Sequence, residues 1–170
     1  VADCALAVEA GASEVDVVFP LGMFADENYE DLCDELTELK HTVRGGKLKV
    51  ILETGALRTA ENIKKASVLA LWSEADFLKT STGKMYPGAS LEAAYVMCCC
   101  IKEYHEKTGR KVGFKASGGI RSTADALGYY AVVRDVLGEE WLCHDLFRIG
   151  ASSLANALLS SMEGEEVKYF

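Results

Sequence analysis

Residues 112–137 read VGFKASGGIRSTADALGYYAVVRDVL. The first six residues form a short, mostly apolar segment that is followed by Gly118-Gly119, which is typical of a buried strand. The segment Ser122-Thr-Ala-Asp125 is close to a capping box, and the amphipathic run behind it ends before Gly138. A strand joined to a helix by a short glycine turn is half of a βαβ unit, so this stretch predicts an α/β fold with a parallel sheet.

The same alternation runs along the whole chain of 170 residues. We expect strands at 14–20, 47–54, 76–81, 112–117 and 146–150. We expect helices at 1–10, at 26–43 with Asp26 as its cap, and at 59–72, 90–107, 122–137 and 152–162. The period of roughly 30 residues matches one βα unit. We therefore predict one domain over residues 1–162, with parallel strands and outer helices, and a loosely ordered tail over 163–170.

Two architectures fit this pattern, and they differ in where their chemistry lies. A doubly wound dinucleotide-binding fold would carry GxGxxG after its first strand, but Pro20-Leu-Gly-Met23 stands there. A TIM (β/α)8-type barrel places its site at the carboxyl ends of the strands. Charged or small polar residues stand at all of these ends, so we favour the barrel type.

Composition excludes several classes of function. The chain has 26 acidic and 18 basic residues, a formal net charge of −8, which argues against a nucleic-acid or anionic-membrane partner. We find no apolar run of about 18 residues and no leader signature, so we expect a cytoplasmic protein. The six cysteines and three histidines have no zinc-ligand spacing. We expect no metal and no cofactor, and we interpret Cys98-Cys99-Cys100 as small helical residues in a reducing compartment.

Two lysines interrupt apolar strands near their ends, namely Lys79 and Lys115, and Asp16 holds the matching place on another strand. A lysine at a strand exit can reach solvent, which is the simplest interpretation of either residue alone. Together, however, they favour an amine nucleophile. An amine attacks a carbonyl only when neutral, and partial burial with a second ammonium nearby disfavours the charged form. Asp16 and the second lysine would then move the protons.

Two glycine- and serine-rich turns lead directly into helices. The first is Lys115-Ala-Ser-Gly-Gly-Ile-Arg121 and the second is Gly150-Ala-Ser-Ser153. Backbone N–H groups at a helix N-terminus form a site for anions, and barrel enzymes often bind phosphate with the loops after their last two strands. The Thr82-Gly83-Lys84 turn lies near them in this topology. We therefore predict a phosphate site.

The motifs together resemble the 2-deoxyribose-5-phosphate aldolase family. They are, in the order of that family, 14–20 (EVDVVFP), 49–55 (KVILETG), 75–84 (ADFLKTSTGK), 112–120 (VGFKASGGI) and 147–153 (FRIGASS). The resemblance implies a class I, metal-free aldolase that cleaves 2-deoxy-D-ribose 5-phosphate reversibly to acetaldehyde and glyceraldehyde 3-phosphate. It implies that Lys79 forms the Schiff base, that Lys115 activates it and that Asp16 belongs to the proton relay. It assigns phosphate binding to Gly83, Lys84, Gly118, Gly119, Ser152 and Ser153.

The number of strands departs from that family. The five expected strands resemble its fourth to eighth, whereas a closed barrel takes about 250 residues. We therefore expect a C-terminal portion of an aldolase. Two alternatives stay open: a catalytically inactive barrel that binds a sugar phosphate or a protein, with a homodimer as one assembly, and a Schiff-base aldolase for another phosphorylated aldehyde.

Overall fold

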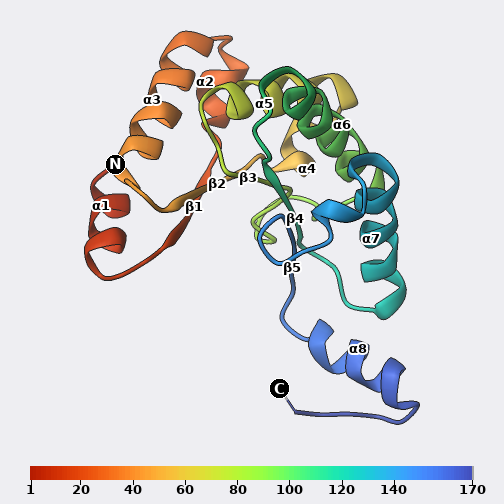
Figure 1. Ribbon diagram of the computed structural model, residues 1–170. Coiled ribbons are helices and arrows are strands. Elements are labelled where there is room, and N and C mark those ends of the chain that lie inside the picture. Colours follow the sequence, from red (N-terminus) through yellow and green to blue (C-terminus); the bar gives the residue numbers. More distant parts are fainter. Residues whose placement is uncertain (170) are drawn as a thin grey trace.

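The computed structural model describes residues 1–169 and contains one five-stranded sheet (Figure 1). The strands are β1 (Glu14–Val18), β2 (Lys47–Ile51), β3 (Phe77–Lys79), β4 (Gly113–Ser117) and β5 (Phe147–Gly150). They lie side by side in the order of the sequence, and every neighbouring pair is parallel. The predicted α/β fold is thus confirmed.

Helices flank the strands along the chain, and most of them lie along the outer side of the sheet, as Figure 1 shows. They are α1 (Ala2–Glu9), α2 (Leu21–Ala25), α3 (Tyr29–Thr42), α4 (Thr54–Leu57), α5 (Ala60–Trp72), α6 (Leu91–Thr108), α7 (Thr123–Leu137), the 3-10 helix η1 (Glu139–Trp141) and α8 (Leu154–Glu163). In Figure 1, α8 projects away from the arch that the other helices form. Among residues 1–169, no helix is both long enough and apolar enough to cross a bilayer.

The predicted helix starts at Thr59, Ser90 and Ser122 are confirmed, because each of these residues caps its helix. Thr59 and Ser90 each accept a hydrogen bond from the backbone of their first turn, and Ser122 and Asp125 form a complete capping box. The expected cap at Asp26 is wrong. Asp26 ends α2, which the sequence pattern did not predict, and Glu27 turns the chain with a φ of 57°. The third helix therefore starts after Asn28.

The core lies between the sheet and the outer helices. Leu32 and Leu36 of α3 are fully buried, as expected from their helical spacing, and Leu48 of β2 is buried as well. Cys98 and Cys100 of α6 are buried in this layer, while Cys99 is partly exposed. The opposite face of the strands carries the charged side chains, so the helices fix the backbone from behind and leave that inner face to the site.

Asp76, just before β3, fastens the amino end of the sheet. Its carboxylate accepts hydrogen bonds from the backbone N–H of Leu48 at 2.8 Å, from Lys40 at 2.6 Å and from Arg110 at 2.7 Å. These contacts join β2, α3 and the segment before β4 to the start of β3. The three-residue strand β3 is thereby held in register although its own ladder is short.

Candidate functional site

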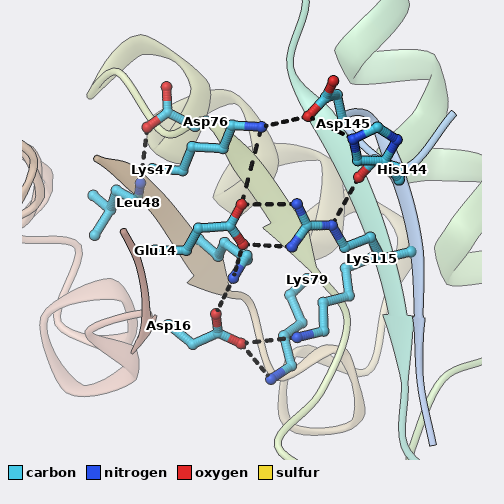
Figure 2. Close-up of polar contacts among 11 residues, drawn as sticks. Glu14, Asp16, Lys47, Leu48, Asp76, Lys79, Lys115, His144 and Asp145 are labelled. Carbon is cyan, nitrogen blue, oxygen red and sulfur yellow. Dashed lines mark hydrogen bonds and ion pairs between the residues drawn. The ribbon is translucent and has the colours of Figure 1, made fainter. Parts of the chain in front are cut away.

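Lysines and carboxylates from four strands meet on the inner face of the sheet (Figure 2). The side chain of Asp16 on β1 accepts a hydrogen bond from Lys79 of β3 at 2.8 Å and another from Lys115 of β4 at 3.2 Å. Both ammonium groups contact the same carboxylate oxygen, Oδ2. The structure thus brings together the three residues that the sequence predicts for catalysis.

A third lysine, which sequence reasoning missed, completes the cluster. Lys49 of β2 pairs with Asp16 in the strand register, and its Nζ lies 2.8 Å from Asp16 Oδ1 and 2.8 Å from Glu14 Oε2. The residue is only 5% exposed. Lys49 therefore bridges two carboxylates that stand two residues apart on the same face of β1.

Glu14 also joins the two outer strands of the sheet. The guanidinium of Arg148 on β5 forms a two-pronged ion pair with Glu14 on β1, one contact measuring 2.7 Å. These strands lie at opposite ends of the sheet order, so the sheet must curl until their inner faces meet. Such planar two-point contacts have a fixed geometry, and this one therefore ties β5 to β1 beside the lysine cluster.

The cluster keeps its carboxylates charged. Burial by itself would raise the pKa of Asp16, but the hydrogen bonds from Lys49 and Lys79, with a further one from Lys115, hold that pKa well below its usual value. The hydrogen bond from Arg148 outweighs burial at Glu14 and, with Lys49, lowers the pKa of Glu14 to about 2. Burial would lower the pKa of Lys49, but hydrogen bonds to Asp16 and Glu14 raise it. Asp16 is thus a fixed anion between three ammonium groups.

The lowered pKa of Glu14 predicts a loss of stability in acid. The folded-state value of about 2 lies below the ordinary 4.5, so this contribution is present above pH 4.5 and is lost as the pH falls toward 2. The Glu14→Gln variant lacks it. We expect the free energy of unfolding of the variant to lie about 2–3 kcal/mol below that of the wild type near neutral pH, with the gap closing in acid.

Urea unfolding at a series of pH values measures this gap. The Glu166→Gln variant is the matched control, because Glu166 forms an ion pair with Lys168 in which both side chains are 75% exposed. The free energy of unfolding of Glu166→Gln should stay close to that of the wild type at every pH. A Glu14→Gln gap that does not change between neutral pH and acid contradicts the assignment.

Beside the lysine cluster lies a cavity of about 530 Å³, which opens to solvent at the carboxyl ends of β3, β4 and β5. Lys79 and Lys115 form part of its wall. Five of the six residues predicted to bind phosphate line it too, namely Gly83, Lys84, Gly118, Gly119 and Ser152. Ser153 precedes α8 without capping it and is not among the lining residues.

Three glycines of this cavity have backbones that other residues adopt only with strain. Gly83, Gly118 and Gly119 have φ values of 74°, 94° and 81°. A Cβ on Gly118 would also lie 2.9 Å from the Cα of Gly88. The turn therefore presents bare backbone to the cavity, as an anion site requires.

The cavity also holds lining residues that the sequence did not single out as ligands. Thr82 and Arg121 face it together with Ser117, Ile120, Gly150 and Ala151. Arg121 could have been found, because it ends the glycine turn that predicted the site and carries a positive charge. Among residues 1–169, no group of three or more histidine, cysteine or acidic side chains is placed to hold a metal ion.

Most of the chain is similar to known aldolases. The model of the DeoC/LacD family aldolases matches residues 1–158. A Mus musculus deoxyribose-phosphate aldolase is 46% identical over 88% of this chain and 47% of its own, and the Homo sapiens enzyme matches equally well. The tetrameric deoxyribose phosphate aldolase from Aeropyrum pernix superposes with a TM-score of 0.72 and 26% identity, over 95% of this chain and 60% of that one. The chain thus spans about half the length of the curated relatives it matches.

Proposed function

The chain belongs to the DeoC/LacD family of aldolases, and we propose that it carries the lysine chemistry and phosphate site of a Schiff-base aldolase. The proposed reaction is the reversible cleavage of 2-deoxy-D-ribose 5-phosphate to acetaldehyde and glyceraldehyde 3-phosphate. The observation that carries it is the contact of Lys79 and Lys115 with one oxygen of Asp16, beside a glycine-lined cavity. The names of the relatives support the substrate.

In the proposed reaction, the neutral amine of Lys79 attacks the aldehyde carbon of the open-chain sugar. Loss of water gives a protonated imine, which draws electrons from the neighbouring carbons. Removal of the proton from the C3 hydroxyl breaks the C2–C3 bond and releases glyceraldehyde 3-phosphate. The electron pair of that bond forms an enamine on Lys79. Protonation at C2 and hydrolysis then release acetaldehyde and restore the amine.

Asp16 and Lys115 are placed to move the protons of these steps. Asp16 Oδ2 touches both ammonium groups, so the charged carboxylate can relay a proton from one lysine to the other along these two hydrogen bonds without holding it. Lys49 holds the other oxygen of the same carboxylate. The carboxylate therefore keeps its position while its contacts with Lys79 change during the reaction.

The phosphate group of the substrate is proposed to bind in the cavity beside the cluster. Lys84 supplies a positive charge, and the turns at Gly83 and Gly118-Gly119 supply backbone donors. We assign Ser152 to this site as well and keep Ser153 as a neighbouring candidate. Remote phosphate binding of this kind fixes the sugar so that its carbonyl meets the amine.

We further propose that the protein works in the cytoplasm, in the breakdown of deoxyribonucleotides, and that it could form a homodimer. The six cysteines are free, which suits a reducing compartment. The division into a domain over 1–162 and a loose tail stays a prediction. Of that tail, Phe170 lies outside the described residues.

Trapping the imine tests the proposed function directly. The protein is incubated with acetaldehyde and borohydride, digested, and analysed by mass spectrometry. We expect an ethyl group on Lys79 well before one appears on Lys168, whose side chain is 75% exposed and serves as an internal control for unselective reaction. Reactivity follows from the neighbouring groups, not from exposure alone.

Equal modification of Lys79 and Lys168 would contradict the aldolase mechanism for this chain. If phosphate still bound to such a protein, the result would favour the sugar-phosphate-binding module. A trapped Lys79 with faster cleavage of a hexose phosphate would instead favour an aldolase for another phosphorylated aldehyde.

A further inference from the structure

Glu53 is a buried acidic residue with an unusual backbone. It follows β2, is only 3% exposed, and has a φ of 55° and a ψ of 59°, which lies in the left-handed region. A residue other than glycine adopts this conformation at a cost, and it persists where the surroundings determine it. Glu53 precedes α4, yet its side chain makes no capping bond to that helix. The buried carboxylate therefore has a different partner.

That partner is Thr82, the first residue of the turn that lines the cavity. The Thr82 hydroxyl donates to Glu53 Oε2 at 2.6 Å, and the Thr82 backbone N–H lies 3.3 Å from both carboxylate oxygens. The same hydroxyl accepts a bond of 3.3 Å from the backbone N–H of Lys84. Since a carboxylate only accepts, it orients the hydroxyl so that a lone pair faces Lys84.

Close packing holds the far end of the same loop. A Cβ on Gly55 would lie 2.4 Å from the carbonyl oxygen of Pro87, and one on Gly88 would lie 2.3 Å from that of Gly118. The loop from Thr82 to Gly88 is thus fixed by backbone contact at its end and by the Glu53 carboxylate at its start. Loss of that carboxylate would free the start alone, where Gly83 and Lys84 face the cavity.

We propose that Glu53 is a positioning residue that fixes the Thr82–Lys84 turn and thereby sets the affinity of the cavity for phosphate. This inference rests on the proposed function for the identity of the phosphate ligand. Glu53 acts through Thr82, and the bond of Thr82 to Lys84 carries the effect to the turn. The Glu53 carboxylate accepts hydrogen bonds from Thr82 and makes no capping bond to α4.

Binding of inorganic phosphate, measured by calorimetry, tests the proposal without any lysine chemistry. Both Glu53→Gln and Thr82→Val are expected to weaken binding by about tenfold, which is about 1.4 kcal/mol. Thr82→Ser keeps the hydroxyl and should bind within about twofold of the wild type. The control Glu61→Gln removes an exposed carboxylate from the first turn of α5 and should leave phosphate affinity unchanged.

The rate of acetaldehyde trapping at Lys79 is the second readout. A substitution that disturbed the structure in general would slow this trapping as well as weaken phosphate binding. Acetaldehyde has no phosphate, so its trapping rate should fall less than about twofold in Glu53→Gln and Thr82→Val. Full phosphate affinity in Thr82→Val, or parallel losses of phosphate binding and trapping, would overturn the proposal. A wild type that binds phosphate but traps no acetaldehyde would instead contradict the aldolase reaction and leave the role of Glu53 standing.

Discussion

Replacement of Lys79 by leucine is expected to lower the rate of the proposed cleavage of 2-deoxy-D-ribose 5-phosphate by about four orders of magnitude or more. Leucine has no amine, so the imine that makes the C2–C3 bond breakable cannot form. The fold should survive, because Asp16 keeps its contacts with Lys49 and Lys115. Phosphate affinity should survive too, since the turn of Gly83 and Lys84 is untouched. The measurement is the initial rate of glyceraldehyde 3-phosphate release at saturating substrate.

Two comparisons sharpen this experiment. Lys168→Leu removes a lysine whose side chain is 75% exposed and should retain wild-type turnover. Lys115→Leu should also lose most activity, since Lys115 shares the carboxylate oxygen of Lys79. Cleavage by Lys79→Leu at more than about a tenth of the wild-type rate would refute the assignment. An acetaldehyde adduct on Lys115 in the Lys79→Leu protein would mean that Lys115, and not Lys79, forms the Schiff base.

The fold could be predicted because its signals are local. Caps such as Ser122 with Asp125 act within one turn of helix, so the structure reproduces them residue by residue. The first three predicted strands run too long at their carboxyl ends, where the chain leaves the sheet, whereas the last two end at the predicted residues. The strand predicted at 47–54 ends at Ile51, and the left-handed Glu53 soon follows. No local rule marks that residue, because the contact that holds it lies 29 positions away at Thr82.

The candidate site could be predicted in part for a related reason. Lys79 and Lys115 could be predicted as site residues because each interrupts an apolar strand. Lys49 did not, because Lys47, Leu48, Lys49 and Val50 alternate as in a strand with one face in water. Only the curl of the sheet turns that polar face inward, and the pair of Arg148 with Glu14 spans 134 positions of sequence. The sequence pattern therefore indicates the faces of a strand but not which face the curl encloses.

The second large effect is expected at Asp16, where Asp16→Asn should lower both turnover and stability. The carboxylate is the common partner of Lys49, Lys79 and Lys115. An amide has one accepting oxygen and a donating nitrogen, so at least one ammonium would face a donor. We expect the free energy of unfolding near neutral pH to fall by about 1–2 kcal/mol, because the Asp16 side chain is 25% exposed and water screens part of its attraction to the lysines. Turnover should fall at least a hundredfold, about the share of a proton-transfer group.

Asp31→Asn separates this effect from a general cost of the substitution. Asp31 is exposed and accepts one bond from Asn28, so its variant should unfold within about 0.5 kcal/mol of the wild type. The pH dependence supplies a second criterion. Because the folded-state pKa of Asp16 is depressed, its contribution is present above its ordinary value of 3.8 and is lost as the pH falls through the lowered pKa. The stability gap between wild type and Asp16→Asn should therefore narrow in acid. A stability gap that stays constant from neutral pH to acid would mean that the charge of Asp16 does not stabilise the three lysines. That result would contradict the proposed role of Asp16 in proton transfer.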